Sequence, residues 1–405
     1  MGQEVFSPFI FGNTVSTKSF TNREEEALKL SRNLLGGTNT IIISPRRWGK
    51  SSLVEKVVLD IQKTEKLHKT VVIDLFTISN ETEFFEVFTR EVIKATSTKW
   101  QDWMDDVKQF LHHLVPSVQI GVKPNIDLTI KYDWEKIVQH TDELLDLPER
   151  IAKAKGIKLI ICLDEFQNLT SFPEFERFEK KMRAIWQRQK QVTYCLYGSK
   201  RHMLSDIFNN KSKPFYRFGD LFLLPKIKEE KWVSFIQESF RETGKKIEPV
   251  IARIIPMIMR NHSWYVQQLS HYVWNTTDKI ARFDQFAHAL DELIYANQPL
   301  YQREIEGLSN TQVNLLKAVT MQEKQLTSTR VMQRYNIGTP RNVSKNKEIL
   351  AGNDMIHKGE DGIYEFLDPA FELWFRKQYF KIPWIISEET LKDYDHSVVE
   401  NLKKP

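Results

Sequence analysis

Residues 44–52 read Ser-Pro-Arg-Arg-Trp-Gly-Lys-Ser-Ser and lie between a short apolar run at 40–43 and a stretch with helical spacing at 51–64. Gly49, Lys50 and Ser51 match the end of the P-loop pattern G-x-x-x-x-G-K-[ST]. Ser44 stands at the position of the first glycine of that pattern. A strand–loop–helix segment of this kind could bind phosphate groups, because a helix N-terminus offers unpaired N–H groups and the positive end of its dipole.

The residue types in this loop each suit phosphate chemistry. Gly49 lets the backbone approach the phosphate oxygens, Lys50 brings a positive charge to the β and γ phosphates, and Ser51 offers a hydroxyl to Mg²⁺. We therefore predict that residues 45–52 bind the phosphates: Pro45, Arg46, Arg47, Trp48, Gly49, Lys50, Ser51 and Ser52. Ser44 could change the loop conformation and lower the affinity of the loop for phosphate groups. The alternative is a basic surface turn that caps a helix.

Two adjacent carboxylates, Asp164 and Glu165, end the apolar run at 159–163. In P-loop ATPases an Asp at a strand end holds Mg²⁺ through water, and a neighbouring Glu can polarise the attacking water. Adjacent residues on a strand point to opposite faces, but at a strand end the chain turns, so both can face the crevice at the carboxyl edge of a sheet. The alternative is a solvated strand-to-helix junction.

Two further polar residues lie next to apolar runs. Ser199 follows the run at 192–198 and could contact the γ phosphate or the attacking water, although a simple turn after a strand would explain it equally well. Arg217 precedes the run at 220–224 and could stabilise charge in the transition state. For Arg217 the alternative is a surface salt bridge.

The elements that must position these residues follow from the apolar runs. Five of them, at 40–44, 70–76, 159–164, 192–197 and 220–224, alternate with helical stretches. This arrangement predicts an α/β fold with a parallel five-stranded sheet and helices on both faces. Residues 97–133 are predicted to form an insertion, in which 117–132 alternates like a hairpin.

After Pro225 we expect the strands to stop and four helices to follow at 228–244, 248–260, 264–278 and 283–296, with a boundary at Gln298-Pro299. Helices at 311–320, 328–335 and 342–351, followed by short strands at 355–358 and 363–367, predict a winged helix-turn-helix. The predicted domains are thus a core at 1–225, a helical lid at 226–300, a winged helix-turn-helix at 301–380 and a tail at 381–405.

Composition limits the class of protein. The chain has 405 residues, of which 41% are hydrophobic, so it can bury sizeable cores. No apolar run approaches the length of a membrane-spanning helix, and the N-terminus lacks the features of a secretory signal. The two cysteines, Cys162 and Cys195, lie in apolar runs, which excludes a disulfide scaffold and favours a cytoplasmic protein.

The order of these motifs resembles the archaeal-type ATPases of the STAND class of P-loop NTPases, which are relatives of the AAA+ proteins. The family pattern has an F-x-x-R-E-x-E-L box, a G-P-R-R-x-G-K-[ST] loop, L-D-E-[FI]-Q, a G-S pair and a Y-x-R element. The matching segments of this chain are 20–26, 44–52, Asp74, 164–167, 198–199 and 216–217. With the C-terminal winged helix, the resemblance covers about residues 20–380.

The resemblance implies that the chain binds ATP and Mg²⁺, hydrolyses ATP slowly and switches conformation. By position, the adenine would lie near Phe20, Asn22 and Arg23, and the metal near Ser51 and Asp164. The catalytic residues would be Lys50, Glu165 and Arg217. Family members often have Gly-x-Pro at the start of a lid helix, where this chain has Asn-His-Ser-Trp-Tyr at 261–265. Trp264 is then either a stacking partner of the adenine or a core residue.

Residues 324–347 contain six basic and no acidic residues: Lys324, Arg330, Arg334, Arg341, Lys345 and Lys347. They could place positive charge against DNA phosphates, or form a solvated face that contacts a protein. The wing at 359–362 is acidic, which counts against insertion into a minor groove. Two other functions compete with a switching ATPase: a DNA-binding regulator with a structural nucleotide and, less well supported, a small-molecule kinase. Self-association that depends on nucleotide is a further expectation.

Overall fold

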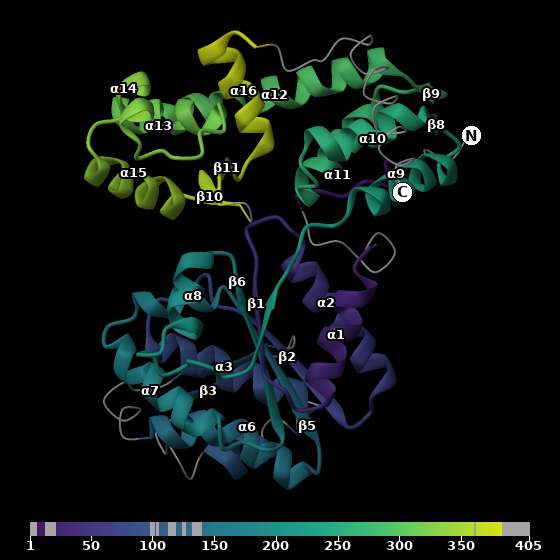
Figure 1. Ribbon diagram of the computed structural model, residues 1–405. Helices are drawn as coiled ribbons and strands as arrows, with labels where there is room; N and C mark the ends of the chain where they lie inside the picture. The colour runs from purple at the N-terminus through teal and green to yellow at the C-terminus, as the bar shows by residue number, and fades with distance from the viewer. Residues whose placement is uncertain are drawn as a thin grey trace, which may run out of the picture. The chain divides into compact units, whose positions relative to one another are not determined.

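The computed structural model describes residues 6–12, 22–97, 102, 105–111, 119–123, 127–131, 140–359 and 362–382. The chain divides into two compact units. The first unit is formed by residues 23–225 and the second by residues 1–22 together with 226–405 (Figure 1). Phe9 belongs to the second unit, where its ring contacts Phe235 and Phe240.

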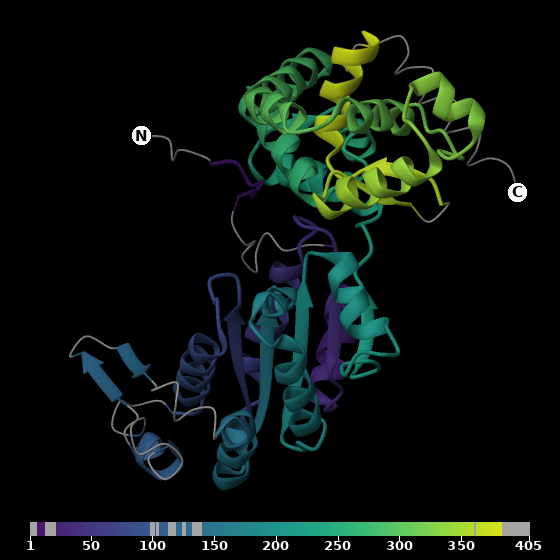
Figure 2. The same cartoon turned by 90° about the vertical axis from the view of Figure 1, so that its left-hand side faces the viewer.

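The first unit contains a five-stranded parallel sheet, as the apolar runs predicted (Figure 2). Its strands are β1 (Thr40–Ile43), β2 (His68–Asp74), β5 (Lys158–Asp164), β6 (Val192–Gly198) and β7 (Asp220–Leu223), in the order β2-β5-β6-β1-β7. Helices lie on both sides of it: α1 (Glu24–Leu35), α2 (Lys50–Thr64), α3 (Glu81–Thr96), α6 (Thr141–Lys155), α7 (Phe175–Trp186) and α8 (Arg201–Asn209). All carboxyl ends of the strands therefore meet at one edge.

Burial on both faces explains why the central strands are apolar throughout. Every residue of β1 and β6 is buried, and so are residues 159–163 of β5. Cys162 and Cys195 lie opposite each other on β5 and β6 as buried free thiols. Aromatic side chains fill the space between sheet and helices, and Trp186 stacks on Tyr194 with ring centroids 4.2 Å apart.

The predicted hairpin is present as β3 (Gln119–Lys123) and β4 (Asp127–Lys131), which pair antiparallel. Residues 107–111 form a π-helical turn, η1 (Val107–Leu111), and much of the helix expected at 100–114 lies outside the described residues. Lys155 of α6 ties this region to the core, because its Nζ donates to the carbonyl of Thr96 at 3.1 Å and pairs with Asp106 at 2.6 Å.

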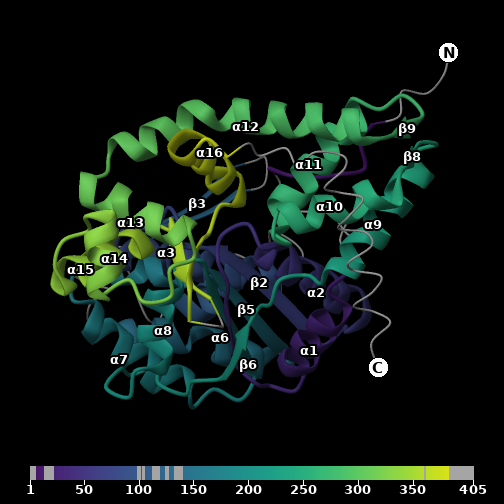
Figure 3. The same ribbon diagram turned by 45° about the horizontal axis from the view of Figure 1, so that its top comes forward.

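The second unit begins with α9 (Glu229–Glu242), α10 (Pro249–Ile258), α11 (Ser263–Asn275) and α12 (Phe283–Glu306). The expectation that strands end at Pro225 was incomplete, since β8 (Lys246–Ile247) and β9 (Ile280–Ala281) form a short parallel pair. The helix expected at 283–296 is longer than predicted, because α12 continues through Pro299 (Figure 3), and the domain boundary expected at Gln298-Pro299 stays a prediction. Pro299 is exposed, while Leu293 and Tyr301 on either side are buried, so packing holds the helix together despite the lost N–H.

The winged helix-turn-helix is confirmed. Its elements are α13 (Asn310–Thr320), α14 (Thr329–Tyr335), α15 (Pro340–Gly352), β10 (Ile356–Lys358) and β11 (Tyr364–Phe366), followed by α16 (Pro369–Phe380). Side chains of Ser309, Ser328 and Thr339 accept backbone N–H groups at the starts of the three helices. The helix α16 was not predicted. The division of this unit at residues 300 and 380 stays a prediction.

Among the described residues, no helix has the length and apolar character needed to cross a membrane.

Candidate nucleotide-binding site

The loop between β1 and α2 turns sharply at two places. Arg47 and Gly49 have left-handed backbone conformations, with φ of 65° and 87°. Gly49 adopts this conformation at little cost, and it immediately precedes the first residue of α2. The first N–H groups of α2 have no partner within the helix, as at any helix start. Ser44 is buried and donates to the carbonyl of Pro45 at 3.2 Å, so the loop accommodates the departure from glycine.

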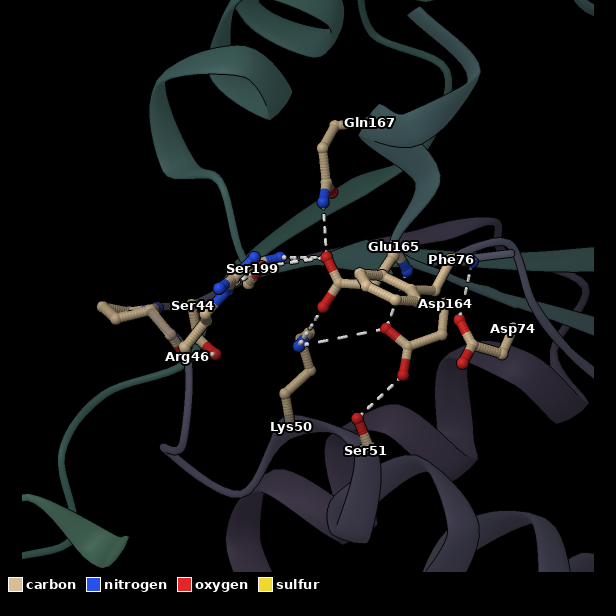
Figure 4. Close-up of polar contacts among 11 residues, drawn as sticks. Ser44, Arg46, Lys50, Ser51, Asp74, Phe76, Asp164, Glu165, Gln167 and Ser199 are labelled. Carbon is tan, nitrogen blue, oxygen red and sulfur yellow. Dashed lines mark hydrogen bonds and ion pairs between the residues drawn. The ribbon is translucent and has the colours of Figure 1, made fainter. Parts of the chain in front are cut away.

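Lys50 and Ser51 reach from the start of α2 toward the acidic pair (Figure 4). The side chain of Lys50 is 7% exposed, and its Nζ lies 3.9 Å from Asp164 Oδ1 and 3.7 Å from Glu165 Oε1. The hydroxyl of Ser51 donates to Asp164 Oδ2 at 2.8 Å. The phosphate loop and the two carboxylates, about 115 residues apart in the sequence, therefore share one site.

A left-handed turn at Glu165 brings both carboxylates to the same side. Glu165 has φ 50° and starts the 3₁₀ helix η2 (Phe166–Ser171) directly after β5. A regular strand would point the two side chains to opposite faces. The backbone N–H of Glu165 donates to Asp164 Oδ1 at 2.7 Å, which fixes the turn. Asp74 ends β2 beside Asp164 and accepts the N–H of Phe76 at 2.9 Å.

Ser199 lies between the loop and the acidic pair, because β6 runs between β1 and β5. Its backbone N–H and its hydroxyl donate to Glu165 Oε2 at 3.3 and 2.9 Å. Arg46 Nε lies 3.4 Å from the Ser199 hydroxyl. The side-chain N–H of Gln167 also donates to Glu165 Oε2. The sequence suggested that Gln167 lies near the site but did not predict which residue it contacts. The feature that could have predicted this contact is its position two residues after Glu165.

The two carboxylates titrate differently. Burial raises the pKa of Asp164, and this effect outweighs the positive charge of Lys50 and the hydrogen bond from Ser51. Burial also raises the pKa of Glu165, but Lys50, Gln167 and Ser199 together bring that pKa below its ordinary value. Neighbouring carboxyl groups whose pKa values are pushed apart are typical of sites in which the two have different roles.

Comparison with known proteins agrees with this geometry. A family model described as a probable winged helix domain matches residues 299–377. The structure is similar to a Walker-type ATPase of Pyrococcus abyssi, with a TM-score of 0.65 and 17% identity, over 91% of this chain and 99% of that one. It is also similar to the ORC2 protein of Aeropyrum pernix, with a TM-score of 0.56 and 14% identity, over 94% and 98% of the two chains.

The chain has the fold of a P-loop ATPase with a C-terminal winged helix. At these identities the similarity shows the fold alone. No curated protein sequence matches the chain.

Within this P-loop fold, Arg217 does not lie at the phosphate loop of its own chain. Since β7 runs parallel to β1 with Asp220 opposite Thr40, residues before Asp220 lie at the amino edge of the sheet. The loop after Ile43 lies at the carboxyl edge, about 10 Å or more away along the strand. The N–H of Arg217 donates to the carbonyl of Phe208, at the far end of α8. The predicted contact of Arg217 with the phosphates of its own chain is thus corrected.

The adenine contacts predicted for Phe20 and Asn22 stay predictions. Phe20 lies outside the described residues. The side chain of Asn22 donates to the carbonyl of Lys231, within the second unit. Trp264 is also in the second unit, where its ring meets Phe11 edge-on with centroids 6.0 Å apart. The part of Trp264 in adenine binding stays a prediction.

Arg23 supports the phosphate loop from inside the first unit. Its side chain is 1% exposed and donates to the carbonyls of Trp48 and Pro225, each at 2.9 Å. It also pairs with Glu26 at 3.2 Å. Burial lowers the pKa of Arg23, and Glu26 counteracts that effect. The guanidinium group is therefore engaged by the protein itself.

The oxygen atoms at this site suit Mg²⁺. Ser51 Oγ and Asp164 Oδ2 are hard oxygen donors at the start of α2 and the end of β5. In the described part of the chain, no group of three or more His, Cys, Asp or Glu side chains could hold a metal ion alone. In nucleotide sites Mg²⁺ commonly binds one or two protein oxygens and takes its other ligands from phosphates and water.

The basic residues of the winged helix are not equivalent. Glu323, which lies just outside the predicted window, pairs with Arg330 at 3.2 Å and with Arg334 at 3.3 Å. Within α15, Arg341 and Lys345 are exposed on one side of the helix, with no ion pair among the described residues. Arg341 and Lys345 therefore present positive charge to solvent without a neighbouring carboxylate that neutralises it among the described residues.

Proposed function

We propose that the chain is an ATPase of the STAND class, which binds ATP with Mg²⁺ and uses hydrolysis to switch conformation. The observation that carries the proposal is the meeting of Lys50, Ser51, Asp164, Glu165 and Ser199 at one edge of the sheet. The similar protein of Pyrococcus abyssi is described as a Walker-type ATPase, and that of Aeropyrum pernix as complexes with ADPNP and ADP.

The phosphates would bind at the N-terminus of α2, against its unpaired N–H groups. Lys50 would then give its charge to the β and γ phosphates. In the structure this charge lies between two carboxylates, so Lys50 would exchange one set of anions for another. Ser51 and Asp164 would hold Mg²⁺, which neutralises phosphate charge.

Glu165 is the candidate base for the attacking water. Its lowered pKa keeps the carboxylate ionised, so it can accept a proton from water. Ser199 holds Oε2 of this carboxylate through two hydrogen bonds. The other oxygen, Oε1, faces Lys50 and hence the side on which the phosphates would lie.

The test is ATP hydrolysis by the wild type and by Lys50→Ala and Glu165→Gln. We expect Lys50→Ala to lose ATP affinity, and Glu165→Gln to bind ATP but to lose about 10²- to 10⁴-fold in kcat. Matched controls are Lys63→Ala, an exposed lysine on α2, and Glu176→Gln, whose side chain is 79% exposed on α7. Equal phosphate release by the wild type, Lys50→Ala and Glu165→Gln would sink the enzymatic proposal.

Self-association is part of the proposal because of where Arg217 lies. A second copy could bring its Arg217 to the γ phosphate of the first copy and stabilise the transition-state charge. We also propose a cytoplasmic location, because the two buried free thiols suit a reducing compartment.

A DNA-binding regulator with a structural nucleotide is the second candidate, favoured by the exposed Arg341 and Lys345 on α15. We expect the double change Arg341→Ala and Lys345→Ala to weaken DNA retention and to reduce the salt slope by about two. Arg330→Ala with Arg334→Ala, which removes the same charge from side chains paired with Glu323, is the matched control.

Three results separate the candidates. DNA binding with tight nucleotide binding but no turnover would favour the regulator. DNA binding together with turnover would make DNA the partner of the ATPase. No DNA binding at any salt concentration would leave the winged helix as a protein-binding surface.

A further inference from the structure

The carboxylate of Glu165 is held on one side only. Its Oε2 atom accepts the side-chain N–H of Gln167, the backbone N–H of Ser199 and the hydroxyl of Ser199. Its Oε1 atom has Lys50 Nζ nearby, at 3.7 Å. A carboxylate on a three-bond side chain can turn freely unless other groups restrain it, and a base must be held within about 0.5 Å of its working position. The three donors on Oε2 supply that restraint.

Gln167 is itself fixed by its surroundings. The residue is 1% exposed and lies on η2, two residues after Glu165. Its carbonyl accepts the hydroxyl of Thr170 at 2.7 Å, which anchors the backbone. Its side chain lies so close to Gly198 that a Cβ atom there would approach Oε1 to 2.0 Å and Cδ to 3.1 Å. Gly198 is therefore needed for space, because any larger residue would displace the amide.

The orientation of this amide is costly for the fold. Gln167 Oε1 is buried and has no hydrogen-bond partner among the described residues. A buried acceptor without a partner destabilises the fold, because it has lost its hydrogen bonds to water. The opposite orientation would place that oxygen against the negative carboxylate of Glu165. The amide of Gln167 thus donates to Glu165 while its own oxygen stays without a hydrogen bond. An unpaired buried group of this kind is expected where the residue serves a functional site.

We propose that Gln167, seated against Gly198, is a positioning residue that holds the Glu165 carboxylate by Oε2 and leaves Oε1 toward the phosphates. The proposal rests on the function proposed for Glu165 and adds how the carboxylate of that base is oriented. Gln167 does not touch the substrate in this role; it acts through Glu165, with Ser199 as the second holder. A merely structural glutamine would affect stability and leave the titration of Glu165 unchanged.

The first test is Gln167→Leu, which keeps the volume and removes the donor. We expect kcat to fall about 10- to 100-fold while KM and ATP affinity stay within about twofold. The acidic limb of the pH–rate profile should move to higher pH, because the hydrogen bond from Gln167 lowers the pKa of Glu165. Lys50 and Asp164, the charged groups that face Glu165, are unchanged in this variant.

Two companion variants keep the test decisive. Gly198→Ala leaves Gln167 in the chain but pushes its amide away, so it should reproduce the loss in kcat. Gln189→Leu is the matched control: it removes an amide that donates to the carbonyl of Leu145, near the amino edge of the sheet, and should leave kcat and the pH profile unchanged. If Gln167→Leu fails to fold, Gln167→Asn keeps the amide in the core with a shorter reach.

A second readout does not depend on turnover. Carboxyl-labelled glutamate allows the titration of Glu165 to be followed by NMR, with Glu165→Gln identifying its signal. In Gln167→Leu this signal should titrate at higher pH than in the wild type. An unchanged titration overturns the proposal, whether or not the protein hydrolyses ATP. A shifted titration in a protein that never releases phosphate would instead refute the ATPase function and keep the role of Gln167.

Discussion

The buried carboxyl group of Glu179 should make the stability of the protein depend on pH. Glu179 lies on α7 and is completely buried, and neither of its oxygens makes a hydrogen bond of normal geometry among the described residues. Burial raises its pKa from 4.5 to about 7; Lys213 and the backbone N–H of Phe215 oppose this only in part, and Glu176 and Asp206 add to it. The folded protein therefore binds a proton here that the unfolded chain has already released.

The direction in which stability changes with pH follows from this difference in bound protons. Below about pH 4.5 both states are protonated, and the group does not weaken the fold. As the pH rises from about 4.5 to about 7, only the unfolded chain releases its proton, so stability is lost over this range. A rise in pKa from 4.5 to about 7 corresponds to about 3 kcal/mol. Glu179→Gln removes the titration, so it should gain about 3 kcal/mol relative to the wild type between about pH 4.5 and about pH 8.5.

The assay is urea unfolding of both proteins at these two pH values. Comparing the variant with the wild type at each pH cancels the titration of all other groups. Glu174→Gln, an exposed carboxylate directly before the same helix, should change the free energy of unfolding equally at both pH values. The reasoning is refuted if Glu179→Gln differs from the wild type by the same amount at both pH values.

Three more predictions come from other parts of the chain. Arg23→Ala should lower the free energy of unfolding by about 3 kcal/mol, because two carbonyls lose a buried donor. The exposed Arg32 on the same helix should tolerate alanine within about 0.5 kcal/mol, and equal melting of the two variants contradicts the first prediction. If Arg217 acts on a neighbouring copy, a mixture of the Arg217→Ala and Lys50→Ala proteins should hydrolyse more ATP than the sum of the two proteins measured separately. Pro299→Ala should raise the melting temperature and stabilise α12 by about 1–3 kcal/mol; a lower melting temperature contradicts this.

The residues at the strand ends could be predicted because a parallel sheet brings all carboxyl ends to one edge. Lys50, Asp164 and Ser199 each follow or end a buried strand, so their meeting follows from the fold class. The same rule should have excluded Arg217 from this site, because a residue that precedes a strand lies at the opposite edge. The direction of the strand that follows Arg217 is therefore the feature of the sequence that places this residue away from the phosphate loop.

Other features depend on tertiary contacts that no local pattern reveals. Pro299 normally ends a helix, yet buried neighbours on both sides continue α12 through it. The strands β8 and β9 are two residues each, too short for any periodicity. The close approach of Gln167 to Gly198 joins residues on η2 and β6, so neither residue type alone predicted it.

The bond between Arg23 and Pro225 bears on how the two units are joined. The chain passes from one unit to the other twice, once after Asn22 and once after Pro225. Because Arg23 donates to the Pro225 carbonyl at 2.9 Å, the two passages start side by side. Arg23 thus fastens the first residue of the first unit to its last residue, and its second bond, to the carbonyl of Trp48, connects both ends to the phosphate loop.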